Sequence, residues 1–151
     1  MRRTWFAEKV EKMNFPSVRD VFTPVAITVG LHESLHNARQ MFRQHHIKQL
    51  PVMDKGKLIG LIKEKDVLLI LGPDFDYPKE SELQVEDAYT SDPLIVDHEA
   101  SLVDTLFLLA EHRCGCALVT RGGILTGIFT DTDACRCFGS FLQKAYLTSS
   151  I

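Results

Sequence analysis

Thr130 and Asp133 form a pair of polar side chains whose spacing suits a bound sugar phosphate. One ionised carboxylate can accept hydrogen bonds from both hydroxyls of a ribose, and a threonine hydroxyl suits a sugar or a phosphate oxygen. The pair follows a predicted strand and opens a predicted helix, whose first amides also favour an anion. The same spacing is typical of two side chains that only cap a helix, so both interpretations stay open.

Asp66 precedes Asp133 by 67 residues, but its neighbours differ. Lys63 stands where the later segment has Thr130, and Lys65 is the second basic residue there. The two ammonium groups could form a phosphate-binding rim. Alternatively, they are solvated charges in a site that has degraded or changed its preference. Asp66 still offers a carboxylate to a ribose, so the pattern predicts a second, weaker site.

The four cysteines form two CxC pairs, Cys114/Cys116 and Cys135/Cys137. Together they could supply four thiolate ligands, although CxC is a less usual zinc spacing than CxxC. Cysteine also behaves as a small buried hydrophobe. With no secretion signal in the sequence we expect reduced, structural thiols in the cytoplasm, and keep a metal or redox sensor as an alternative.

The elements that position these residues occur twice, because the chain aligns with itself without a gap at an offset of 67 residues. Twelve aligned positions carry the same residue in both stretches: Val18/Val85, Asp20/Asp87, Thr23/Thr90, Val29/Val96, Ser34/Ser101, Leu35/Leu102, His45/His112, Val52/Val119, Gly56/Gly123, Leu58/Leu125, Gly60/Gly127 and Asp66/Asp133. A duplication of this kind indicates two copies of one supersecondary unit that bury a shared core.

Each copy predicts a β-α-β-β-α unit of the α/β (α+β) class, preceded by a short helical turn. A short strand comes first, a helix capped by Ser34 or Ser101 follows, and two apolar strands then flank a glycine turn before a last helix. The predicted segments are an N-terminal amphipathic helix at 1–16, copy one at 17–71, a linker at 72–83, copy two at 84–139 and a tail at 140–151.

The composition excludes several classes of protein. The chain has 151 residues, 45% of them hydrophobic and 25% charged, and a net charge of −3. Dispersed basic residues and a negative net charge argue against nucleic-acid binding, and no apolar run reaches the roughly 20 residues of a membrane-spanning helix. No Ser/His/Asp set, HExxH or P-loop is present, so we expect no enzyme.

The segments VRDVFTPVAITV and IKQLPVMDKGKLIGLIKEKDV of copy one, with their counterparts in copy two, resemble the CBS domain, named after cystathionine β-synthase. The motif Gly-h-h-Thr-x-x-Asp, where h is apolar, is complete at Gly127–Asp133, while copy one has Lys63 in place of its threonine. The resemblance implies tandem CBS repeats packed as a pseudo-two-fold pair, or Bateman module. It also implies an adenine nucleotide (AMP, ADP, ATP or an adenosyl compound) as regulatory ligand, no other cofactor, a homodimer and an unidentified regulated protein.

In the family the aspartate binds the ribose, the threonine contacts phosphate or ribose, and adenine lies between apolar side chains near the first strand. Proline keeps the segment before that strand extended, with backbone groups free for a base edge, unless it is a simple turn. The residues expected at the main site are Thr130, Asp133, Asp131, Thr90, Pro93, Leu94, Ile95 and Ala117. Those expected at the doubtful site are Asp66, Lys63, Lys65, Thr23, Val25, Ile27 and Leu50.

Two alternatives to a nucleotide sensor remain. One is a dimerising interaction scaffold without ligand, whose best feature in the sequence is the aromatic pair Trp5/Phe6. The other is the thiol or metal sensor.

Overall fold

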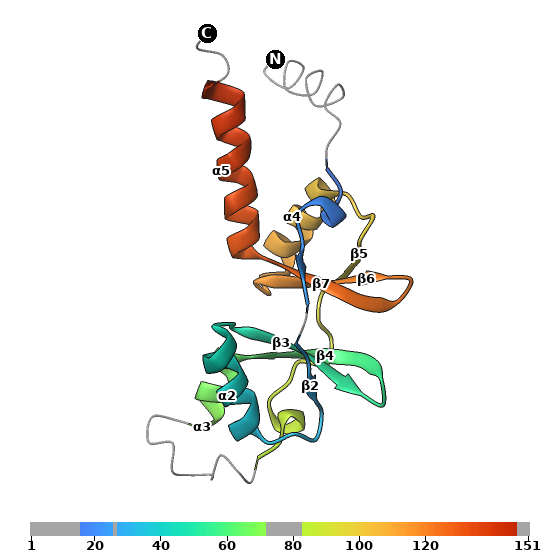
Figure 1. Ribbon diagram of the computed structural model, residues 1–151, viewed down its shortest axis with the longest axis vertical. Helices are drawn as coiled ribbons and strands as arrows, with labels where there is room; N and C mark the ends of the chain where they lie inside the picture. Colours follow the sequence, from blue (N-terminus) through green and yellow to red (C-terminus); the bar gives the residue numbers. More distant parts are fainter. Residues whose placement is uncertain (1–15, 26, 72–82, 148–151) are drawn as a thin grey trace.

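Two layers of strand face each other across the middle of the molecule, and the helices lie on their outer sides (Figure 1). We describe residues 16–25, 27–71 and 83–147 of a computed structural model. A small apolar cluster of Leu61, Cys116 and Leu118 joins the two sheets at the centre. The predicted N-terminal helix and most of the predicted linker lie outside the described residues.

The elements follow the predicted order in both copies. In copy one they are η1 (Val18–Asp20), β1 (Thr23–Pro24), β2 (Val29–Gly30), α2 (Leu35–His45), β3 (Gln49–Asp54), β4 (Lys57–Lys63) and α3 (Glu64–Leu71). In copy two they are η2 (Val85–Asp87), β5 (Ile95–Asp97), α4 (Leu102–His112), β6 (Cys116–Arg121), β7 (Ile124–Thr130) and α5 (Asp131–Leu147). The predicted fold class and the caps of α2 and α4 by Ser34 and Ser101 are confirmed.

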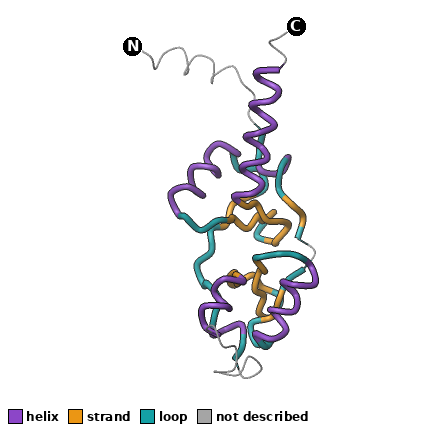
Figure 2. The backbone as a smooth tube through the Cα atoms, turned by 90° about the vertical axis from the view of Figure 1, so that its left-hand side faces the viewer, coloured by secondary structure: helices purple, strands orange, loops and turns teal. Residues whose placement is uncertain are grey.

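Two of the predicted strand boundaries need correction. The apolar run Ile27–Val29 predicts the first strand of copy one, but the strand is Val29–Gly30, so Ile27 precedes it. Thr23–Pro24 forms a strand of its own instead of a simple extended lead. The tail at 140–151 was expected to continue the last helix, and α5 does extend into it as far as Leu147; the helix projects from the body in both views (Figures 1 and 2).

The two sheets are built alike, except that one has gained a strand from the other copy. In copy one the strand order is β2-β3-β4; in copy two it is β1-β7-β6-β5. β3 and β4, like β6 and β7, are antiparallel, and each pair has a register shift after Val52 or Val119. The added strand β1 comes from copy one and pairs antiparallel with β7.

This crossing is one half of a symmetric exchange between the copies. Val18 of η1 is fully buried in the core of copy two, and its N–H donates to the carbonyl of Ala100 at 2.9 Å. Val85 of η2 is equally buried in the core of copy one, and its N–H donates to Glu33 at 2.8 Å. Each copy therefore completes its core with the opening turn of the other.

The repeated glycines Gly60 and Gly127 make room for this exchange. A Cβ atom on Gly127 would lie 2.0 Å from the ring of Phe22, and one on Gly60 would lie 2.5 Å from the ring of Tyr89. Each aromatic ring belongs to the opening segment of the opposite copy. Any larger side chain at either glycine would displace the exchanged segment.

None of the helices that the structure describes has both the length and the apolar character that a bilayer crossing requires.

Candidate functional site

A cleft of about 530 Å³ lies at the exit of β7, between the two copies. We call it the Thr130 cleft; its wall is formed by Thr23, His46, Ile47, Lys48, Gln49, Gly115, Ile128, Thr130, Asp131, Thr132 and Asp133. Copy two supplies the strand-to-helix junction, and copy one supplies β1 and the connection between α2 and β3. The cleft therefore exists only because the two copies pack together.

Thr130 and Asp133 cap α5 by exchanging hydrogen bonds. The Asp133 N–H donates to Thr130 Oγ1 at 3.3 Å, while Asp133 Oδ2 accepts from the N–H and the hydroxyl of Thr130 at 2.9 and 3.0 Å. Threonine before the first helical residue and an acid three positions on is a capping box. The capping interpretation of this pair is thus confirmed. The cap uses only one carboxylate oxygen of Asp133, Oδ2, for its bonds with Thr130.

The other oxygen, Asp133 Oδ1, faces Arg136 at 3.4 Å. The Arg136 side chain is 72% exposed while that of Asp133 is 11% exposed. An exposed arginine at this distance is a weak, replaceable partner. Oδ1 is therefore the part of the carboxylate that remains for a sugar hydroxyl.

The opposite wall is basic, since His46 and Lys48 both line it with exposed side chains. Helix α2 ends with His46 in the left-handed conformation at φ 53°, and the N–H of His46 returns to Phe42. The Lys48 carbonyl then accepts the first N–H of α3, from Glu64, at 3.0 Å. These bonds fix the backbone that carries the two basic side chains along the cleft.

The exchange regroups the residues that the sequence assigned to separate sites. Thr23, assigned with Asp66, lines the Thr130 cleft, and its strand pairs with β7. Val25, which follows this strand, donates its N–H to the carbonyl of Thr126 at 3.2 Å. Thr90, assigned with Asp133, instead pairs with Leu61 of copy one through bonds of 2.7 and 3.0 Å. The structure thus places each threonine beside a strand of the opposite copy.

Several of the predicted contact residues line neither this cleft nor the neighbouring cavity described below. Leu50 and Ala117 are fully buried inside the two cores. Ile27 packs against the core of copy one, and Leu94 against that of copy two. Of the rest, Pro93 and Asp66 are partly exposed, and Ile95 is 47% exposed on β5.

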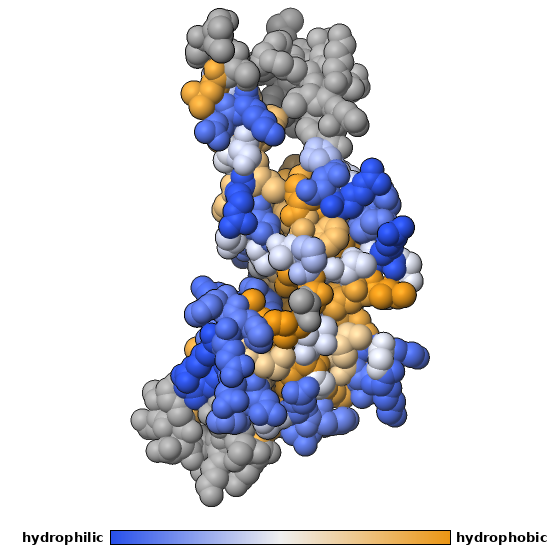
Figure 3. All heavy atoms as spheres, viewed as in Figure 1, coloured by the Kyte–Doolittle hydropathy of each residue, from blue (hydrophilic) through white to orange (hydrophobic). Residues whose placement is uncertain are grey.

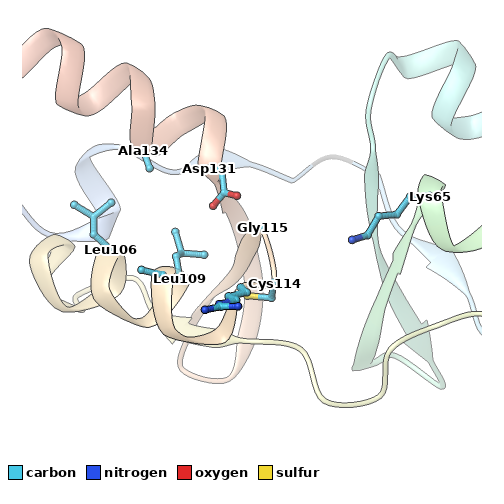
Figure 4. A pocket seen from close by; sticks show the side chains of 9 residues that line it. Lys65, Leu106, Leu109, Cys114, Gly115, Asp131 and Ala134 are labelled. Carbon is cyan, nitrogen blue, oxygen red and sulfur yellow. The ribbon is translucent and has the colours of Figure 1, made fainter.

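The two lysines differ in their surroundings: Lys65 is exposed, as expected of a solvated charge, whereas Lys63 is not. Lys63 is partly buried, and its ammonium donates to the carbonyl of Cys114 in the opposite copy. Lys65 lines a cavity of about 510 Å³ and extends from copy one toward Asp131, Gly115 and Cys114 (Figure 4). The floor of this cavity is apolar: it comes from Leu106, Leu109, Ala110 and Ala134. Lys63 thus joins the two copies, and Lys65 lines a cavity between them.

The cysteines are placed as structural thiols, except for Cys135, which is exposed. Burial raises the pKa of Cys116 to about 11, against a lowering by Lys63, and burial also raises the pKa of Cys137. A raised pKa disfavours the thiolate that binds metals. Within the described ranges, no three histidine, cysteine or acidic side chains gather into a group that could hold a metal ion.

The sequence analysis missed His46, Lys48, Gln49 and Ile128. Their position relative to Thr130 depends on how the sheets face each other, which hydrophobic periodicity does not encode. The available signal was Lys48 in the segment before β3, because its counterpart in copy two is Gly115.

The chain is similar to proteins of two kinds. Hypoxic response protein 1 of Mycobacterium tuberculosis is 31% identical over 124 residues, which cover 80% of this chain and 83% of that protein. Inosine-5'-monophosphate dehydrogenase of Korarchaeum cryptofilum is 29% identical over 128 residues, which cover 84% of this chain. The matched region spans only 24% of that enzyme.

Solved structures share the fold. CBSX2, a CBS-pair protein of Arabidopsis thaliana, superposes with a TM-score of 0.75 at 25% identity, over 86% of this chain and 99% of CBSX2. The crystal structure of CBSX2 in complex with AMP gives a TM-score of 0.71 at 27% identity, over 83% and 97% of the two chains. The family model of the CBS domain matches residues 18–72 and 85–140. With both of its copies matched, the chain belongs to the CBS domain family.

Proposed function

We propose that this protein is a regulatory module of the cytoplasm that binds one adenine nucleotide in the Thr130 cleft. The observation that carries the proposal is the composition of that cleft, in which a partly free carboxylate faces two basic side chains. The carboxylate can accept hydrogen bonds from ribose hydroxyls, and the basic side chains can bind a phosphate. CBSX2, a protein of the same fold, has been crystallised with AMP.

The charges determine how the ligand lies. The amides at the start of α5 attract an anion, but Asp131 and Asp133 in its first turn oppose one. Lys48 and His46 are the basic residues in the lining of the cleft, and they lie on the facing wall. We therefore place the ribose at Asp133 and the phosphate toward Lys48, so the ligand joins copy two to copy one.

A ligand held this way can regulate a partner. Because it contacts both copies, it favours the arrangement in which the two walls stand at the right separation. A partner protein that recognises this arrangement would sense the occupancy of the cleft.

Isothermal titration with AMP, ADP, ATP and S-adenosylmethionine tests the proposal. We expect Asp133→Ala and Thr130→Ala to weaken binding at least tenfold, and Lys48→Ala to weaken AMP more than adenosine. The matched control is Asp66→Ala, which changes the equivalent carboxylate of copy one and should leave binding near the native value. No heat from any of the four compounds, or an equal loss in the control, contradicts the proposal.

Helix α5 favours a second candidate, the dimerising scaffold. Its large apolar side chains Phe138, Phe141, Leu142, Tyr146 and Leu147 are 37–72% exposed. Orange apolar surface also shows across the middle of the molecule (Figure 3). A homodimer that buries α5 suits either function. Light scattering with and without AMP, together with the titration above, separates the sensor from the scaffold. A dimer that forms equally with and without AMP, in a protein that binds no nucleotide, indicates the scaffold.

A further inference from the structure

The two copies differ most at the position of Thr130, where copy one has Lys63. The internal offset of 67 residues relates each part of the Thr130 cleft to a second place in the molecule. Thr90 and Leu61 there form the pairing that Thr23 and Ile128 form beside the Thr130 cleft. We call this place the Lys63 site; it comprises Leu61, Lys63, Asp66, Thr90 and Cys114.

The side chain of Lys63 crosses this site from one wall to the other. Its ammonium donates to the carbonyl of Cys114. The counterpart of Cys114 is Ile47, which lines the far wall of the Thr130 cleft. Thr130, by contrast, is short, and its hydroxyl turns back to Asp133. A threonine leaves the space between the walls open, while a lysine spans it. The open cavity beside Lys65 and Cys114 is a different space, because neither Asp66 nor Thr90 lines it.

The surroundings of Lys63 agree with a spanning side chain. Lys63 is partly buried, and its positive charge acts on the Cys116 thiol of the opposite copy, lowering a pKa that burial raises. An ammonium that leaves bulk water needs a hydrogen-bond acceptor, and here the carbonyl oxygen of Cys114 is that acceptor. The contact also links the end of β4 to the start of β6.

We propose that Lys63 closes the Lys63 site from within, so that the chain binds one nucleotide and not two. This inference rests on the nucleotide binding proposed above. Lys63 is thereby the residue that determines the stoichiometry. It also ties the copies together at the site that holds no ligand.

Titration of the full chain with AMP, read as equivalents bound, tests the inference. The native protein should bind one equivalent, and Lys63→Thr, which restores the complete motif, should bind two. The added equivalent should disappear in Lys63→Thr/Asp66→Ala and persist in Lys63→Thr/Asp133→Ala. Lys63→Ser supplies the same hydroxyl and serves if the threonine variant fails to fold.

The outcomes separate this inference from the proposed function. A native stoichiometry of two, or a single equivalent in both hydroxyl variants, overturns the role of Lys63 and leaves nucleotide binding standing. If the native chain binds no AMP, the proposed function fails. The inference about Lys63 then stands only if Lys63→Thr binds one equivalent of AMP and Lys63→Thr/Asp66→Ala binds none; any other result overturns it as well. Lys63→Met should also lower the unfolding midpoint by about 2–4 °C, and an unchanged midpoint speaks against the contact.

Discussion

At the scale of single residues, Asp133 combines a structural and a proposed binding role. Its Oδ2 closes the capping box of α5 with Thr130. Among the residues that the structure describes, its Oδ1 pairs with the exposed Arg136 alone. Capping and ligand binding, which the sequence left as alternatives, are therefore compatible in one carboxylate. The cap orients the side chain that a sugar would meet.

The cap can be measured separately from any ligand through Thr130. We expect Thr130→Val to lower the free energy of unfolding by about 1 kcal/mol, because valine has the shape of threonine but no hydroxyl for the Asp133 N–H. Thr130→Ser keeps the hydroxyl and should stay close to the native value. Urea unfolding without nucleotide gives both numbers. If serine and valine cost the same, the hydroxyl does not stabilise the helix start.

Cys116 makes stability depend on pH in the alkaline range. Burial raises its pKa from 9.0 to about 11. Between these values the unfolded chain loses a proton that the folded chain keeps, so the free energy of unfolding falls as pH rises, by about 1.4 kcal/mol per pH unit. Below pH 9 the contribution is fully present.

The comparison is between slopes, because Cys116→Ala also leaves a small cavity. Between pH 9 and 11 the stability of Cys116→Ala should fall less steeply than that of the native protein. Cys135→Ala, which removes an exposed thiol, should keep the native slope. Parallel curves for native protein and Cys116→Ala would show that the thiol ionises alike in both states.

At the scale of elements, the sequence predicted what local pattern encodes and missed what depends on the pairing of copies. The repeat, the order of elements and the serine caps follow from spacing and residue type. The strand Thr23–Pro24 does not, because its partner β7 lies about a hundred residues away. The same exchange places Thr23 in the Thr130 cleft, whereas the sequence had grouped it with Asp66 of its own copy.

Gly127 tests whether β1 depends on close contact with β7. Gly127→Ala would place its Cβ 2.0 Å from Phe22 and 2.7 Å from the carbonyl of Thr23. We expect a loss of about 1–3 kcal/mol in unfolding free energy, and weaker AMP binding because Thr23 moves. Urea unfolding and titration measure the two effects.

The matched control is Gly139→Ala in α5, where a Cβ atom meets nothing within 4 Å. Alanine is the better helix former, so this variant should gain about 0.5–1 kcal/mol. A similar loss in both variants would mean that the effect at Gly127 is not the clash with β1.

At the scale of the whole molecule, the exchange makes two copies one folding unit. Val18 and Val85 each complete the core of the opposite copy, and the cluster of Leu61, Cys116 and Leu118 joins the sheets. A unit of about 50 residues buries too little surface to be stable alone. Neither copy has a complete core without the other, so the molecule should unfold in one step.

Val18→Ala tests this coupling, because Val18 belongs to copy one in sequence and to copy two in packing. Truncation of a fully buried valine should cost about 2 kcal/mol. In a single folding unit that loss is shared: amide hydrogen exchange should speed up by a similar factor in β3 and in β6, although Val18 contacts only the core of copy two. The native protein should also give one calorimetric transition whose van't Hoff enthalpy equals the measured enthalpy.

Division of the chain gives the complementary result. Residues 1–76 and 77–151, expressed separately, should each lack a cooperative transition, since each lacks the valine that fills its core; expressed together, they should copurify and melt as one species. The decisive comparison is between the two strands in Val18→Ala. Faster exchange confined to β6, or a lone half that melts cooperatively, would show two independent domains, and a ligand between the copies would then have no rigid frame through which to act.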